Sequence, residues 1–251
     1  MSRRAICLAA AAALSVAIVA LLDPVAQDPR YHDFADGRTR LGIPCAANVL
    51  SNLPFVVVGW IGLWRARRAA SGRLPLAVFS ASVLLTGFGS GWYHLQPGSA
   101  RLVWDRLPLG VSCLALLDVL IDRRLGARPA RLLLAPLVLF GLGSVLWWAW
   151  GESAGHGDLR AYGLAQFFPA LGIVVLLWPP ARGDADAAAV WRALACYAAA
   201  KLAEHFDTGI FALGHVVSGH TLKHLLAATA AACLLPLARP APDPQVSRRS
   251  P

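Results

Sequence analysis

The stretch TGFGSGWYHLQPGSARLVWD, residues 86–105, lies in an otherwise apolar part of the chain and decides how the rest is interpreted. It places Ser90 and His94 four residues apart and then, just past a Gln-Pro-Gly turn, Asp105. If the first part is helical, the hydroxyl and the imidazole share one face, because residues i and i+4 are one turn apart. Ionisable groups inside apolar helices are costly, so this pattern predicts a functional site.

A second stretch, SGHTLKH at residues 218–224, repeats the spacing with His220 and His224. Two imidazoles one helical turn apart can bind the same metal ion. A third imidazole from another helix completes a three-histidine site and leaves one coordination position open for water. The sequence therefore predicts a zinc site whose ligands are His94, His220 and His224.

The composition places this site in a membrane. Of the 251 residues, 57% are hydrophobic and only 15% are charged, which is too few charges to cover the surface of a soluble domain of this size. The apolar residues also form blocks of about 20, the length that crosses a bilayer as a helix. The prediction is an all-α, polytopic transmembrane bundle with a seven-helix core and one N-terminal anchor helix.

The expected spans divide the chain into three parts. Residues 1–30 hold the anchor helix, within residues 5–22, and the start of an extracytoplasmic loop; a signal peptide cleaved near Val25-Ala26 is the alternative. Residues 31–237 form the seven-helix domain, and residues 238–251 form a disordered cytoplasmic tail rich in Pro, Ser and Arg. The seven expected core spans are residues 43–64, 74–95, 102–121, 132–150, 162–178, 187–207 and 211–237.

Arginines alternate between the loops and predict the orientation. One side of the bundle receives Arg3, Arg4, Arg65, Arg67, Arg68, Arg73, Arg123, Arg124, Arg128, Arg131, Arg182, Arg239, Arg248 and Arg249, and the other side only Arg30, Arg38, Arg40, Arg101, Arg106 and Arg160. By the positive-inside rule, the first side and both termini are cytoplasmic. All five candidate site residues then fall towards the extracytoplasmic side, although the arginines alone set the topology.

The formal net charge of +9 does not indicate nucleic-acid binding. The arginines occur in short loops between apolar runs, where they determine topology, and do not line one face of a helix or domain. No nucleic-acid partner is expected.

The candidate residues suit hydrolysis of a carbonyl compound. Zinc held by three neutral imidazoles lowers the pKa of a bound water towards about 7. Ser90 can donate a hydrogen bond to the developing oxyanion, and Asp105 can take up the proton and pass it to a leaving amine. The spacing alone leaves alternatives open: histidines that only pack, a bis-histidine haem site, or a structural zinc. The sequence contains no HExxH motif of soluble metalloproteases.

Several motifs also resemble one family. GSGWYH (residues 89–94), LVWDRLP (102–108) and GHTLKH (219–224) resemble the alkaline ceramidases, within the seven-helix membrane hydrolases that include the adiponectin receptors. NVLSNL (48–53) resembles that family's Asn-x-x-Ser-Asn-Leu signature. The resemblance runs from about residue 31 to residue 235.

The resemblance implies zinc on His94, His220 and His224, with Ser90 and Asp105 assisting water. It implies hydrolysis of the carbon–nitrogen amide bond of a ceramide-like membrane lipid to a long-chain base and a fatty acid. The segment HDFADGR (residues 32–38) is similar to bacterial members, which implies a bacterial inner membrane. The runner-up function is a non-enzymatic lipid sensor with a structural zinc.

Two further groups of polar residues have expected roles. The animal members of the family bind calcium with an acidic N-terminal segment and a glutamate; here Cys45 aligns with that glutamate, and only Asp33 and Asp36 supply carboxylates. Calcium binding is therefore doubtful. Lys201 and Glu204 are expected to form a buried ion pair.

Overall fold

The computed structural model describes residues 2–179 and 183–240, and the regular elements of this part of the chain are helices, without a strand. Two isolated bridges, Arg40 with Ile43 and Ala69 with Pro240, are its only β-type pairings. The predicted all-α class is confirmed.

The chain forms ten α-helices in the described residues. Two short 3₁₀ helices are added: Pro29–His32 lies between the first and second α-helices, and Leu235–Leu237 follows the last. The α-helices are α1 (Arg3–Leu21), α2 (Ala46–Leu50), α3 (Leu53–Ala66), α4 (Arg73–Leu95), α5 (Ser99–Leu125), α6 (Ala127–Ser153), α7 (Arg160–Leu177), α8 (Ala185–His205), α9 (Asp207–Ala212) and α10 (Gly219–Cys233).

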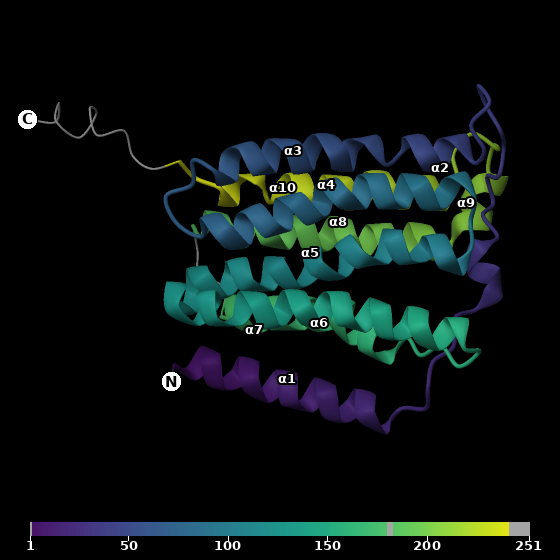
Figure 1. Ribbon diagram of the computed structural model, residues 1–251. Coiled ribbons are helices and arrows are strands. Elements are labelled where there is room, and N and C mark those ends of the chain that lie inside the picture. Colours follow the sequence, from purple (N-terminus) through teal and green to yellow (C-terminus); the bar gives the residue numbers. More distant parts are fainter. Residues whose placement is uncertain (1, 180–182, 241–251) are drawn as a thin grey trace, which may run out of the picture.

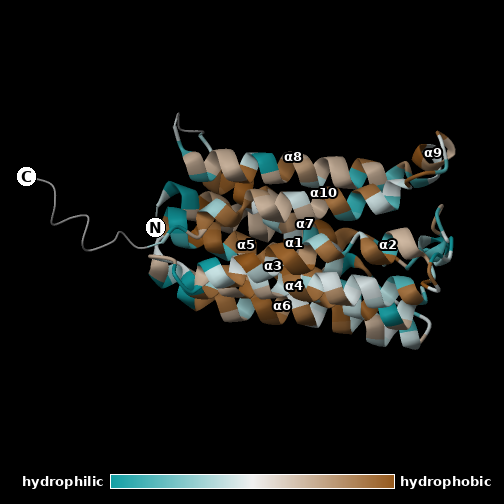
Figure 2. Ribbon diagram, turned by 90° about the horizontal axis from the view of Figure 1, so that it is seen from above, coloured by the Kyte–Doolittle hydropathy of each residue, from teal (hydrophilic) through white to brown (hydrophobic). Residues whose placement is uncertain are grey.

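The long helices lie side by side along one common direction, with the connecting loops gathered at the two ends (Figure 1). Hydrophobic residues cover much of the helix length and hydrophilic residues gather at the ends (Figure 2). Five segments are long and apolar enough to cross a membrane: α1, the α2–α3 pair, α4, α6 and α7. A membrane protein is thus indicated, with five candidate spans in place of the predicted eight.

The three remaining bundle helices, α5, α8 and α10, are not candidate membrane spans, for identifiable reasons. α5 and α8 carry too many charged side chains, and α10 has only 15 residues. These helices lie within the same bundle: α5 packs on α4, α6 and α7, and α10 packs on α8 and α3. They also supply most of the candidate site, as described below.

Two expected spans are interrupted. The one at residues 43–64 is divided into α2 and α3 at Ser51 and Asn52. The expected helix at 211–237 is wrong at its start, because the chain forms α9, a loop with His215 at φ 53°, and then α10. Ser218 sets the new start, since its hydroxyl accepts the Thr221 N–H as an N-cap.

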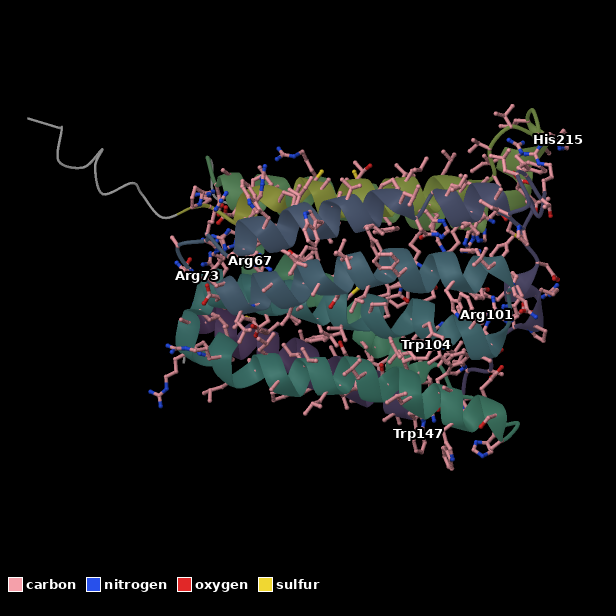
Figure 3. All side chains as sticks on the ribbon, turned by 45° about the horizontal axis from the view of Figure 1, so that its top comes forward. Arg67, Arg73, Arg101, Trp104, Trp147 and His215 are labelled. Atoms are coloured by element: carbon pink, nitrogen blue, oxygen red, sulfur yellow. The ribbon has the colours of Figure 1, made fainter. Side chains whose placement is uncertain are left out.

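The two ends of the bundle differ in charge. Arg67 and Arg73 lie at one end, and Arg101 and His215 lie at the opposite end (Figure 3). The arginine-rich end also holds the first residues of α1 and the last described residues of the chain (Figure 1). Of the arginines assigned to it from sequence, Arg182, Arg248 and Arg249 lie outside the described residues.

The start of the predicted disordered tail packs against the bundle. Ala238 is buried, and the Ala70 N–H donates to the Arg239 carbonyl at 2.9 Å. Residues 241–251 lie outside the described part of the chain.

Candidate metal centre and adjoining cavity

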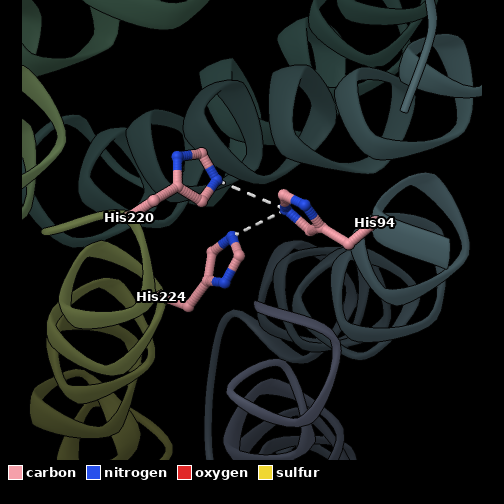
Figure 4. A group of neighbouring side chains, drawn as sticks. All are labelled: His94, His220 and His224. Atoms are coloured by element: carbon pink, nitrogen blue, oxygen red, sulfur yellow. Dashed lines mark hydrogen bonds between the residues drawn. The ribbon is translucent and has the colours of Figure 1, made fainter. Parts of the chain in front are cut away.

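Three buried histidines meet at the end of the bundle opposite the arginine-rich loops. His94 lies in the last turn of α4, while His220 and His224 lie in the first turns of α10. The Nε2 atom of His94 lies 3.3 Å from Nε2 of His220 and 3.3 Å from Nε2 of His224 (Figure 4). One ligand atom from each histidine lies within 4.8 Å of the others.

This geometry fits a tetrahedral metal ion. Nitrogen ligands about 2.0–2.1 Å from zinc and separated by the tetrahedral angle lie roughly 3.3–3.4 Å apart. The two Nε2–Nε2 distances of 3.3 Å agree with that value. The three imidazoles can therefore bind one metal ion through Nε2, and the donor set suits zinc.

The α2–α3 junction orients His224. Its Nδ1 atom lies 2.8 Å from the Ser51 hydroxyl, so the Nδ1–H tautomer donates to Ser51 and leaves Nε2 free for a metal. The Asn48 side chain carbonyl accepts the Thr221 hydroxyl at 2.7 Å, which fastens α10 to the same junction. Asn52 in turn donates to the Asn48 backbone carbonyl at 2.7 Å.

Asp207 and Gly219 position the start of α10. One carboxylate oxygen of Asp207 accepts the His220 N–H at 2.7 Å, and the other accepts the Ala35 N–H at 3.0 Å. Gly219 lies so close to α8 that a Cβ there would clash with the Ala203 carbonyl and the backbone of Asp207. A side chain at this position would therefore displace the start of α10, which carries His220 and His224, relative to His94.

A segment before α2 covers the triad. The ring of Phe34 packs against His94 and His220, with ring centroids 4.6 and 4.4 Å apart. Beside it, His32 Nδ1 lies 2.8 Å from the Tyr93 hydroxyl. Burial, with the nearby Arg106 charge, lowers the pKa of His32, so this imidazole is neutral near pH 7.

A cavity of about 620 Å³ adjoins the triad. Ser90, Asp105 and His224 all line it, so the predicted catalytic residues and one metal ligand share one space. Most of its remaining wall is apolar: α1 contributes Ile18, the residue after α1 is Leu22, and α7 contributes Phe167 and Leu171, all four of them solvent-accessible. The anchor helix α1 and its neighbour α7 therefore form part of the cavity wall.

A close helix crossing brings Ser90 and Asp105 to this cavity. Gly89 on α4 packs directly on α5, where a Cβ would clash with the Trp104 carbonyl oxygen. Because Ser90 follows Gly89 and Asp105 follows Trp104, the crossing sets both side chains at the same level of the bundle. Gly91, two residues further on, has open space around its Cβ position and plays no such part.

Three charged residues from α8 and α10 complete the cavity wall: Lys201, Glu204 and Lys223. The expected Lys201–Glu204 ion pair is present, with Nζ 2.8 Å from Oε2. Lys223 donates to the other carboxylate oxygen at 3.0 Å. Its Nζ also lies 3.1 Å from His220 Nε2, the nitrogen that faces the metal position.

The two aspartates considered for calcium are placed differently. Arg38 engages both carboxylate oxygens of Asp36 at 2.7 Å, and these hydrogen bonds lower the pKa of Asp36. Among the described residues, the histidine triad is the one cluster of at least three potential metal ligands, and Asp33 does not belong to such a cluster. The Asp36 carboxylate therefore serves as an anchor for Arg38, which also donates to the His215 carbonyl at 2.7 Å.

The structure thus brings together the five residues singled out from sequence and adds others. Ser51 and Asn48 had a sequence signal, because they are polar residues at the start of an apolar run. Phe34 had none, because aromatic residues of this kind occur throughout the loops and span ends. Lys223 stood out as a charge between the two histidines of α10, but the sequence did not show that its acidic partner is Glu204. Asp207 was visible only as one acidic residue at the end of an expected span.

Comparison of the chain with protein-family models, with curated proteins and with solved structures found no match in any of the three. The functional argument therefore rests on the residues and geometry described above.

Proposed function

We propose that this chain is a zinc-dependent amidohydrolase of the membrane that cleaves the amide bond of a ceramide-like lipid. The products are a long-chain base and a fatty acid. One observation carries the proposal: three buried imidazoles converge with zinc-like spacing beside a lipid-sized cavity that Ser90 and Asp105 also line. The motifs that resemble the alkaline ceramidases support the choice of substrate class.

The proposal includes a topology. α5, α8 and α10 cross the bilayer with the five apolar segments, which gives a seven-helix core with α1 as an N-terminal anchor. The arginine-rich end faces the cytoplasm, so both termini are cytoplasmic and the triad lies towards the extracytoplasmic side. A bacterial inner membrane fits this arrangement.

His94, His220 and His224 would hold the zinc through Nε2. Zinc held there would make a bound water ionise near neutral pH, and the zinc itself would polarise the amide carbonyl. Ser90 donates a hydrogen bond to the carbonyl oxygen as it gains negative charge. Asp105 accepts the proton that the attacking water releases and passes it to the amine nitrogen as the carbon–nitrogen bond breaks. The net change is addition of one water across the amide.

The test is elemental analysis and ceramide turnover on the same detergent-purified samples. We expect about one zinc per chain in the unaltered protein. His220→Ala should lose both zinc and turnover, whereas Ser90→Ala should keep its zinc and lose about 2.7–4 kcal/mol of transition-state stabilisation, the usual effect of removing one oxyanion donor. His205→Ala is the matched control, because His205 is exposed and outside the triad.

The other possible results would each point to a different role for the three histidines. Full turnover in metal-free protein would overturn the mechanism. Zinc without turnover of any amide lipid would favour a lipid sensor with a structural zinc, whose fourth position is filled by a protein side chain. A coloured preparation with a Soret band would identify haem in place of zinc.

A further inference from the structure

The cavity beside the triad carries more positive than negative charge. Three cationic side chains line it from three helices: Arg106 of α5, Lys201 of α8 and Lys223 of α10. The carboxylates in the same lining are Asp105 and Glu204. A fourth lining cation, Arg160, is compensated outside the cavity by Asp158 at 2.8 Å.

The two lysines share one counter-ion. Glu204 accepts from Lys201 at 2.8 Å through one oxygen and from Lys223 at 3.0 Å through the other. Glu204 can balance only one of the two ammoniums, and Asp105 is the only other carboxylate in the described lining set against Lys201, Lys223 and Arg106, so the lining keeps one positive charge in excess. In an apolar cavity of a membrane protein such a charge is costly unless a ligand supplies the opposite sign.

Arg106 is the third cation in this count. Its guanidinium is buried and donates to a neutral acceptor, the side-chain carbonyl of Gln27, while Nη1 has no hydrogen-bond partner in the described chain. It has no ion-pair partner among residues 2–179 and 183–240. The rings of Trp148 and Tyr162, at 4.3 and 4.9 Å, offset part of its charge through cation–π contact.

Two of the three cations lie close to the candidate metal position. Lys223 Nζ is 3.1 Å from the metal-facing nitrogen of His220. Lys201 is one step further away, because Glu204 joins it to Lys223. Lys201 has the more exposed side chain, 36% against 17% for Lys223, so its ammonium is the more accessible to a ligand. An anionic group held here would lie only a few bonds from an amide at the metal.

We propose that the lysine pair selects amide lipids that carry an anionic group, a carboxylate or a phosphate, within a few bonds of the amide. Neutral amide lipids of the same chain length then bind more weakly. The assignment of the amide rests on the proposed function, whereas the requirement for an anion rests on the charge of the cavity. Lys201 and Lys223 act in recognition, and Glu204 positions both.

The test compares two pairs of probes that differ only in charge. N-palmitoylglycine and N-palmitoylethanolamine share acyl chain and amide, and ceramide 1-phosphate and ceramide form the phosphate pair. Dissociation constants are measured by tryptophan fluorescence on metal-free protein in a neutral detergent, and turnover is measured on zinc-loaded protein. We expect the acidic member of at least one pair to have a dissociation constant at least about tenfold lower than its neutral partner. This difference in affinity is called the gap below, and the pair that shows it identifies the anion.

Variants locate the effect. Lys201→Met and Lys223→Met should each reduce the gap to within about threefold, and Lys201→Arg should retain it because the charge is kept. Arg192→Met is the matched control, since Arg192 is an exposed cation of α8, the helix that carries Lys201, and does not line the cavity. Equal binding of charged and neutral probes, no binding of any probe, or a gap that both methionine variants retain would overturn the proposal. A gap without turnover would leave it standing and overturn the proposed hydrolase alone.

Discussion

The helices α1 and α10 show how differently two segments of one bundle are held. α1 has 19 residues of mean hydropathy 2.2, only 6% of its apolar stretch is buried, and its main neighbour is α7. α10 has only 15 residues, fewer than the roughly 20 that cross a bilayer as a helix, yet its start is buried and hydrogen-bonded to several neighbouring segments. Asp207, Asn48 and Glu204 all hold residues of α10 through their side chains.

The difference explains which helices hydropathy detects. A helix that faces lipid must be apolar along its length, and α1 meets that condition. Some helices that carry the candidate chemistry contain several charged groups, as α5 does with Asp105 and α8 does with Glu204, and are therefore less apolar. In this chain the weaker hydropathy of α5 and α8 reflects their part in the site, whereas α4, which carries Ser90 and His94, is still apolar enough to span a membrane.

The largest effect is expected from disrupting the close contact between the start of α10 and α8. Gly219→Ala introduces a Cβ where the Ala203 carbonyl and the Asp207 backbone already lie, so the start of α10 must move away from α8. We expect a stability loss of about 1–3 kcal/mol or more, the usual cost of overpacking, together with loss of bound zinc. Thermal unfolding and elemental analysis measure the two effects.

Gly209→Ala is the control for that substitution, because a Cβ at Gly209 meets nothing within 4 Å. It should keep both zinc and melting temperature. If Gly219→Ala kept its zinc as well, the close contact between α10 and α8 would not be what positions His220.

An intermediate effect is expected from the partner of His224. Ser51→Ala removes the hydroxyl that lies 2.8 Å from His224 Nδ1 and so loosens the orientation of the ring. Loss of such a supporting contact typically lowers metal affinity about 10–100-fold. Competition with a zinc chelator measures it, and Ser82→Ala is the control because that hydroxyl donates only to the Val78 carbonyl of its own helix. Equal zinc affinity in both variants would count against the role of Ser51.

The smallest expected effect on the metal follows from removing α1. Deletion of residues 2–22 should leave zinc content unchanged, because no triad residue belongs to α1 and its main contacts are with α7. The same deletion removes one wall of the cavity and should weaken amide-lipid binding about tenfold, equivalent to losing roughly 55 Å² of apolar contact at about 25 cal/mol/Å². Zinc loss on deletion would show that α1 supports the triad.

The sequence could predict what depends on local spacing. Ser90 with His94, and His220 with His224, are one helical turn apart, so their shared faces follow from the helix itself. The likeness of the Asn48–Leu53 segment to a known signature also pointed to this end of the bundle. The helical class and the arginine-poor end that holds the triad were predictable from composition and loop charges.

What could not be predicted depends on contacts between distant segments. Asp207 joins α10 to the chain near Ala35, and nothing near Asp207 in the sequence indicates either partner. The break before α10 was missed because the hydrophobic run at residues 211–217 looks continuous with the helix that follows. The approach of α5 to α4 depends on Gly89, which is one of several glycines in the same helix and differs from Gly91 only in its neighbours.

The apolar cavity wall that α1 and α7 supply has a kinetic consequence for the proposed lipid substrate. A substrate that enters past this wall would arrive by diffusion within the bilayer plane, so the encounter rate would follow its mole fraction among the surrounding lipids. Adding inert phospholipid at constant total substrate should then slow turnover in proportion, as in surface dilution. A water-soluble short-chain amide, which does not partition in this way, should escape that dependence.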